Sequence, residues 1–89
     1  MKGSWALVTG ASAGMGRAIA QALAARGVNL LVNARRENRL LELEEELHGK
    51  HGVQVAPLVF DIRDPKQCTS VLEGKADLVS KVSILVNNA

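Results

Sequence analysis

The chain has 89 residues, of which 47% are hydrophobic and 22% charged, and its formal net charge is +2. This length allows at most one small domain, and the apolar share is sufficient for a folded core, which excludes a disordered chain. The basic residues are spread along the sequence, which argues against a nucleic-acid partner. No segment resembles a signal peptide or a membrane span, so we expect a cytoplasmic protein without a membrane partner.

The first predicted elements are a buried strand over residues 5–9 and a helix over residues 14–26, with Gly27 as its C-cap. The glycine-rich segment 9–16, Thr-Gly-Ala-Ser-Ala-Gly-Met-Gly, joins them. In such a turn the backbone approaches a phosphate closely, and the helix N-terminus offers it unpaired N–H groups. The segment therefore predicts a dinucleotide-binding turn. The alternative is that its glycines only make a tight strand-to-helix connection.

The three glycines of this turn have different expected roles. Gly10 allows the sharp turn out of the strand, Gly14 removes a Cβ where the cofactor sits, and Gly16 lets the helix pack tightly on the sheet. A mononucleotide-binding P-loop requires Lys and then Ser or Thr at the helix start, whereas Arg17 follows Gly16 here. This excludes a P-loop kinase or ATPase.

The alternation of strands and helices continues along the chain. Residues 28–33 predict a second strand, residues 38–48 a second helix, and residues 53–60 a third strand interrupted only by Pro57. The second helix is expected to bury three leucines, Leu40, Leu43 and Leu47.

The last predicted elements are a helix and a fourth strand. Asp64 followed by Pro65 is a strong helix start, and this third helix is expected to run toward Val79, weakened at Gly74. Residues 83–87 then predict the fourth strand. Alternating strands and helices imply an α/β fold with parallel pairing and right-handed crossovers. We expect part of a doubly wound Rossmann sheet with strand order 3-2-1-4, truncated after the fourth strand.

Cysteine and histidine provide little functional signal. Cys68 is the single cysteine, so an internal disulfide is excluded, and its helical context favours a small buried apolar residue. His48 and His51 flank a turn without further evident ligands, so we expect no metal site.

Four motifs, in order, resemble the short-chain dehydrogenase/reductase family in its NAD(P)-dependent form. Residues 9–16 match its T-G-x-x-x-G-x-G motif, and residues 87–89 match the beginning of N-N-A-G. Asp61, just past the third strand, matches the acidic residue that contacts adenine, and residues 30–36 match the strand and turn that select the cofactor. The resemblance covers essentially the whole chain.

The resemblance implies a cofactor site built from the glycine-rich turn and the ends of the later strands. Its expected members are Gly10, Ser12, Ala13, Gly14, Met15, Gly16, Arg35, Arg36, Asp61, Ile62, Asn88 and Ala89. Asn88 and Ala89 are expected beside the nicotinamide-side ribose, and Asn87 is expected to brace the sheet. The alternative for Asp61 is an ordinary loop residue.

The end of the second strand predicts which cofactor binds. Where NAD-preferring relatives carry a carboxylate for the ribose 2′-OH, this chain has Ala34, followed by Arg35 and Arg36. A guanidinium binds a 2′-phosphate with charge-assisted hydrogen bonds, so NADP(H) is expected and NAD(H) is less favoured. The alternative is that an arginine covers apolar surface or pairs with Glu37.

The resemblance implies hydride transfer between nicotinamide and a carbonyl or secondary alcohol, with a Ser and a Y-x-x-x-K segment as the catalytic groups. The chain contains no tyrosine, so we expect no catalytic residues and no turnover from these residues alone. Residues 34–36, 40–42 and 61–64 are most similar to relatives acting on 3-hydroxy acids or 3-oxoacyl groups. We expect the N-terminal part of a short-chain oxidoreductase; the alternative is a non-catalytic nucleotide-binding or interaction module. A small-molecule substrate would bind the full-length protein, and the exposed fourth strand is expected to mediate self-association.

Overall fold

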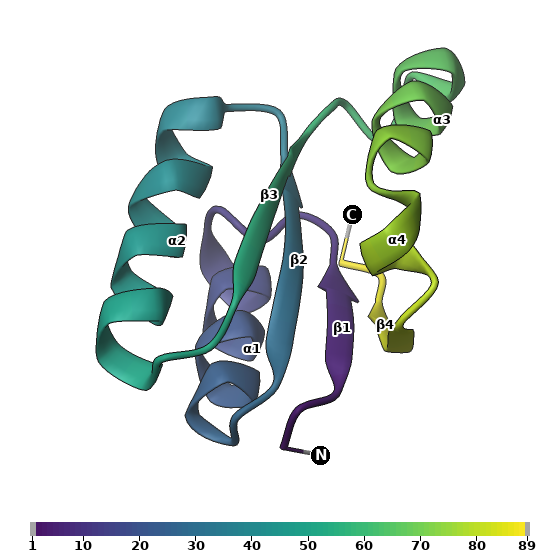
Figure 1. Cartoon of the computed structure of the whole chain (residues 1–89). Helices are drawn as coiled ribbons and strands as arrows, with labels where there is room; N and C mark the ends of the chain where they lie inside the picture. Colours follow the sequence, from purple (N-terminus) through teal and green to yellow (C-terminus); the bar gives the residue numbers. More distant parts are fainter. Residues whose placement is uncertain (1, 89) are drawn as a thin grey trace.

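A parallel four-stranded sheet forms the centre of the computed structural model, which describes residues 2–88 (Figure 1). Its strands are β1 (Trp5–Val8), β2 (Asn29–Ala34), β3 (Val55–Val59) and β4 (Val82–Val86). Their order is β3-β2-β1-β4 and every neighbouring pair is parallel, which confirms the predicted topology. The carboxyl ends of all four strands therefore lie at one edge of the sheet.

The helices cover both faces of this sheet (Figure 1). α1 (Gly14–Ala25) and α2 (Glu37–His51) pack on one face, and α3 (Pro65–Gly74) and α4 (Ala76–Val79) pack on the other. α2 is longer than expected, since it begins at the residue after Arg36 and ends where Gly52 adopts a left-handed conformation with φ 71°. Within residues 2–88, no helix combines the length and hydrophobicity of a membrane span.

The single third helix expected from the sequence is divided into α3 and α4. The N-cap prediction is confirmed, because the Asp64 carboxylate accepts the Gln67 N–H at 3.2 Å and Pro65 occupies the first turn. The interruption follows Gly74, where Lys75 leaves the helical conformation with φ −119°. Glycine weakens a helix because its backbone loses the most freedom on ordering, and here that weakness ends the helix.

Alternate strand residues divide between the two faces of the sheet. Ala6, Val8, Leu30 and Val32 face α1 and α2, where the three leucines predicted for α2 are fully buried, as expected. The other face buries Trp5, Leu31, Leu58 and Phe60. Neither α3 nor α4 contributes a fully buried side chain, and Cys68 is half-buried, not buried as predicted. This second face is therefore the more thinly covered.

α1 and α2 are also joined by polar contacts. The Arg17 guanidinium donates to Glu46 at 2.6 Å, and the Gln21 amide donates to the other oxygen of that carboxylate at 3.0 Å. Arg17, although it directly follows the glycine-rich turn, is thus directed toward α2. This contact fixes the start of α1 relative to α2 and leaves Arg17 out of the expected cofactor site.

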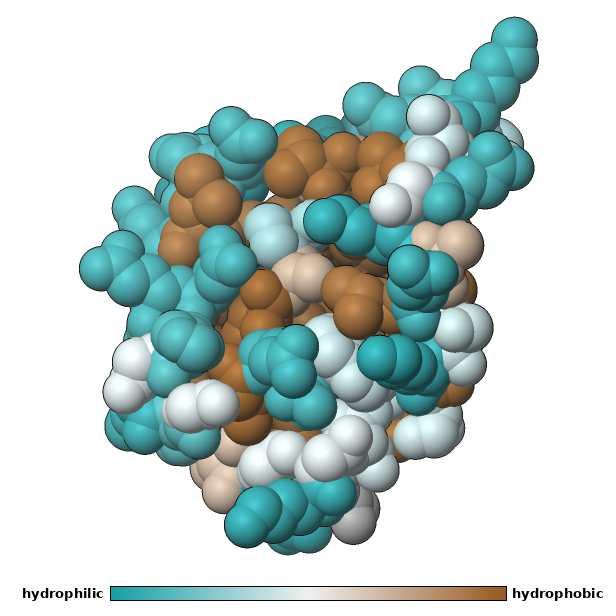
Figure 2. All heavy atoms as spheres, in the orientation of Figure 1, coloured by the Kyte–Doolittle hydropathy of each residue, from teal (hydrophilic) through white to brown (hydrophobic). Residues whose placement is uncertain are grey.

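The two edges of the sheet differ in how they are protected. The edge strand β3 is half-buried for most of its length and carries Pro57, which has no N–H to donate to another strand. Figure 2 shows apolar atoms exposed along this part of the surface, with hydrophilic side chains around them. β4 contains no proline, and among residues 2–88 it pairs only with β1. Since the Val86 carbonyl accepts the Thr9 N–H at 3.0 Å, the backbone groups of Ser83 and Leu85 point to the outer edge.

We therefore predict that the chain associates through β4 and that Leu85→Lys suppresses this association. Leu85 is 67% exposed, so the substitution removes little core packing, and a lysine on an edge strand opposes pairing with another strand. Sedimentation velocity over a range of concentrations measures the effect. Leu41→Lys, at an exposed leucine of α2, is the matched control and should associate like the unmodified chain. A chain that is monomeric at every concentration before substitution contradicts the prediction.

Candidate cofactor-binding site

The glycine-rich turn lies at the carboxyl end of β1, and each of its glycines meets a different surrounding. Gly10 and Gly14 have φ of 61° and 60°, a region that L side chains rarely adopt. A Cβ on Gly10 would collide with the Asn88 carbonyl, and one on Gly16 would collide with the Gly10 carbonyl. A Cβ on Gly14 would meet no heavy atom within 4 Å. Gly10 and Gly16 therefore close the turn, whereas Gly14 borders open space.

Gly16 differs in detail from its predicted role. Its closest approaches are to the Gly10 backbone and to the Asn88 side-chain nitrogen, which would lie 2.7 Å from a Cβ. The tight packing at this glycine is thus with the turn itself and with the residue that follows β4.

Thr9 connects the turn to the end of β4, a role that sequence reasoning did not assign. Its hydroxyl accepts the Asn88 N–H at 2.9 Å and lies 3.3 Å from both the Val86 carbonyl and the Asn87 side-chain oxygen. The Asn88 amide also donates to the Gly10 carbonyl at 3.4 Å. Asn88 is thereby held against the turn, and the Asn87 side chain contacts Thr9, the residue that follows β1. Ala89 lies outside the described residues.

The first turn of α1 follows directly from this loop. Its N-cap, Ala13, is extended with φ −156° and ψ 162°, it has no side-chain oxygen, and the first turn contains no acidic residue. The N–H groups of the first turn therefore lack side-chain acceptors in the described part of the chain. Such a helix start favours an anion through its N–H groups and its dipole.

Asn33 anchors the ends of β2 and β3 beside the turn. It is buried, and its side-chain amide donates to the Leu58 and Phe60 carbonyls at 3.1 and 3.0 Å, while its own carbonyl accepts the Ala11 N–H at 2.9 Å. One residue thus joins β2, β3 and the turn. Periodicity predicted a strand here but did not indicate this role, because an asparagine in a buried run gives no sign of its partners.

Two neighbouring hollows open at this carboxyl edge. One, of about 410 Å³, lies between the turn and the ends of β2 and β3, and the other, of about 290 Å³, lies between the turn and α2. Ser12 and Arg35 line both. The first is also lined by Gly10, Asn33, Ala34, Phe60, Asp61, Ile62 and Arg63, and the second also by Ala13, Arg36 and Arg39. A larger hollow of about 570 Å³ lies between α2 and β3, away from the turn.

The structure brings most of the predicted site residues together and adds Arg39 and Arg63. Arg36 is the N-cap of α2 and Arg39 lies three residues later in its first turn, and this spacing could have indicated Arg39. Met15 is 71% exposed and lines neither hollow, whereas Ile62, 42% exposed, lines the larger of the two beside the turn.

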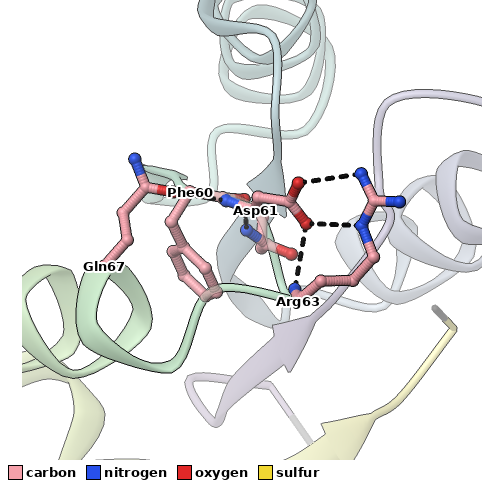
Figure 3. Close-up of polar contacts among 5 residues, drawn as sticks. Phe60, Asp61, Arg63 and Gln67 are labelled. Atoms are coloured by element: carbon pink, nitrogen blue, oxygen red, sulfur yellow. Dashed lines mark hydrogen bonds and ion pairs between the residues drawn. The ribbon is translucent and has the colours of Figure 1, made fainter.

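Asp61 is held by a neighbour two residues along the chain (Figure 3). Its carboxylate accepts three hydrogen bonds from Arg63: the backbone N–H at 2.9 Å, Nε at 3.1 Å and a terminal guanidinium nitrogen at 3.0 Å. The Asp61 N–H donates to the Gln67 side chain at 2.8 Å. These hydrogen bonds from Arg63 lower the pKa of Asp61 from 3.8 to about 2, and the positive charge of Arg35 acts in the same direction. The carboxylate is therefore ionised throughout the physiological pH range.

Comparison with known proteins identifies the family. A family model described as short chain dehydrogenase matches residues 4–89. The chain is 45% identical to sulfoacetaldehyde reductase 2 of Chromohalobacter salexigens over 93% of this chain and 32% of the relative. It is 43% identical to the 3-oxoacyl-[acyl-carrier-protein] reductase of Escherichia coli over 99% of this chain and 34% of the relative.

A solved structure gives the same result. The L-sorbose reductase of Gluconobacter frateurii, complexed with NADPH and L-sorbose, superposes with a TM-score of 0.92 at 36% identity, over 100% of this chain and 34% of that one. The chain thus spans about a third of the length of the relatives it matches. With the glycine-rich turn, the strand order and the family match in agreement, the chain belongs to the short-chain dehydrogenase family.

Proposed function

We propose that residues 1–89 form the N-terminal NADP(H)-binding part of an oxidoreductase that reduces a carbonyl or oxidises a secondary alcohol on a small molecule. The observation that carries the proposal is the group of three arginines on one hollow beside the glycine-rich turn. Neither ion pair found within residues 2–88 involves Arg35, Arg36 or Arg39. An ion pair with Glu37, one alternative considered from the sequence, therefore does not position Arg35 or Arg36.

The residues present fit the phosphates of NADP(H). Three guanidinium groups around about 290 Å³ match a 2′-phosphate, which guanidinium binds with paired, charge-assisted hydrogen bonds. Ala34, where a carboxylate would repel that phosphate, is small and buried. The open space at Gly14 and the first turn of α1 fit the pyrophosphate.

The remaining contacts fit the two ends of the dinucleotide. Asp61 and Ile62 line the hollow of about 410 Å³, which Arg35 also lines, and this position suits the adenine end of the dinucleotide. Asn88, fixed by Thr9 and Gly10, lies at the carboxyl ends of β1 and β4, which suits the nicotinamide-side ribose. When bound, the cofactor would donate a hydride to the carbonyl in its reduced form or accept one from the alcohol in its oxidised form, and these residues would bind and orient it.

For the substrate we propose 3-oxoacyl groups first. Relatives at 39–43% identity include very-long-chain 3-oxoacyl-CoA reductases and the Escherichia coli 3-oxoacyl reductase.

The chain has no tyrosine, so the proton donor that the family resemblance implies is not among its residues. The second candidate is the alternative considered from the sequence, a non-catalytic nucleotide-binding module. Reading the coding DNA beyond Ala89 for codons of Y-x-x-x-K distinguishes the two.

Isothermal titration of the chain with NADP⁺ and NAD⁺ tests the proposal. We expect NADP⁺ to bind at least about tenfold more tightly, with a preference that declines as salt is added, because partly exposed charges are screened. Equal affinities contradict the NADP preference. Binding of neither dinucleotide contradicts the proposed function.

A further inference from the structure

The hydrogen bonds from Arg63 leave the Asp61 carboxylate one free acceptor position for a ligand. An ionised carboxylate offers about four acceptor positions, two on each oxygen. Arg63 fills both positions of one oxygen with its backbone N–H and Nε, and one position of the other with a terminal nitrogen (Figure 3). A single acceptor position remains, on Oδ2. The side chain of Asp61 is 30% exposed and lines the hollow of about 410 Å³, so a ligand in that hollow can reach the carboxylate.

The backbone of Asp61 is fixed as well. Its N–H donates to the Gln67 side chain, in the first turn of α3. The preceding residue, Phe60, is also held at both backbone groups: its N–H donates to the Ala34 carbonyl at 3.2 Å, and its carbonyl accepts from the Asn33 side chain. The orientation of the carboxylate is thus fixed from both its side chain and its backbone. Rotation of the carboxylate would break its contacts with Arg63.

A carboxylate of this kind distinguishes purines by the group at position 6. It accepts a hydrogen bond from the 6-amino group of adenine, whereas the 6-oxo group of hypoxanthine is itself an acceptor and repels it. Hypoxanthine carries a donor at N1, and a mobile carboxylate can turn toward that donor. A carboxylate held on three sides cannot, so the discrimination depends on the residue that holds it.

We propose that Arg63 is a positioning residue that fixes Asp61 as a directed hydrogen-bond acceptor and thereby makes the nucleotide site select a 6-aminopurine over a 6-oxopurine. The inference rests on the proposed dinucleotide-binding function and adds the source of its base selectivity. The side chain of Arg63 is 73% exposed and lies in no core cluster, so its two-point contact with Asp61 is its main interaction among the described residues.

The test compares NADP⁺ with its hypoxanthine analogue, nicotinamide hypoxanthine dinucleotide phosphate, by isothermal titration of the chain. The unmodified chain should bind NADP⁺ about tenfold or more tightly than the analogue, as expected for a hydrogen bond to a charged group. Arg63→Gln should reduce this ratio to about threefold or less. Arg63→Lys should reduce it as well, because lysine keeps the charge but not the two-pronged geometry.

Arg26→Gln is the control, since Arg26 is an exposed arginine at the opposite end of α1. Its ratio should equal that of the unmodified chain. Nuclear magnetic resonance of Asp61 should show its pKa rising from about 2 toward its ordinary value in Arg63→Gln, which verifies that the contact between the two side chains has been lost.

Several outcomes would overturn the inference. If Arg63→Gln weakens both dinucleotides equally, Arg63 contacts the base or supports the fold and does not position Asp61. Full discrimination in Arg63→Lys shows that charge alone is sufficient. Equal binding of both dinucleotides by the unmodified chain contradicts the inference but not the proposed function, whereas binding of neither contradicts both.

Discussion

Arg35→Ala is expected to weaken NADP⁺ binding about tenfold or more while leaving NAD⁺ binding almost unchanged. Arg35 lines both hollows at the carboxyl edge of the sheet and has no ion-pair partner within residues 2–88. Loss of a hydrogen bond to a charged group costs about 1.5–3 kcal/mol, and each 1.4 kcal/mol is tenfold in affinity. NAD⁺ lacks the 2′-phosphate, so it has no such contact to lose.

Two further variants separate this role from general charge. Arg39→Ala should also weaken NADP⁺ selectively, because Arg39 lines the smaller hollow with Arg35 and Arg36. Arg26→Ala removes one positive charge far from both hollows and should have no effect on the ratio of the two affinities. The measurement is isothermal titration at fixed salt, since screening changes every such value. An equal loss for NADP⁺ and NAD⁺ in Arg35→Ala would show that Arg35 supports the fold.

The sequence was sufficient for the architecture because the relevant signals are local. Leu40, Leu43 and Leu47 repeat at helical spacing and are fully buried, and the glycines at positions 10 and 14 have the positive φ that only glycine adopts readily. Parallel pairing followed from the alternation of strands and helices, and the strand order followed from the Rossmann arrangement that the sequence suggested. Where the signal was weak, as at Gly74, the prediction of one continuous helix was wrong.

The side-chain connections of the site could not be predicted in this way. Thr9 meets Asn88 across 79 positions of sequence, and Asn33 meets Phe60 across 27. Such contacts depend on where parallel strands bring distant residues, which periodicity does not specify. Asp61 was assigned to adenine from the family resemblance, yet its contact with Arg63 was missed although the two are near neighbours, because neither composition nor spacing fixes a side-chain rotamer.

Gly16→Ala should destabilise the chain by about 1–3 kcal/mol, the usual cost of an extra group in a tightly packed site. Alanine is about 1 kcal/mol more favourable than glycine in a helix, so intrinsic propensity alone predicts the opposite sign. Sterics decide the outcome, because the added Cβ would collide with the Gly10 carbonyl and lie 2.7 Å from the Asn88 side-chain nitrogen. The backbone of the turn and the residue after β4 would both have to move. NADP⁺ binding should fall as well, since we propose that the same turn binds the pyrophosphate.

Gly49→Ala is the matched control, because the same substitution then occurs inside α2 where a Cβ meets no heavy atom within 4 Å. There helix propensity acts alone, and the variant should be more stable than the unmodified chain by up to about 1 kcal/mol. For a domain of this size, 1 kcal/mol shifts the melting temperature by about 4–8 °C, so thermal unfolding followed by circular dichroism resolves two shifts of opposite sign. If both variants melt higher than the unmodified chain, the turn can accommodate a methyl group at position 16, and the close approach of Gly10, Gly16 and Asn88 is not what fixes the geometry of the cofactor site.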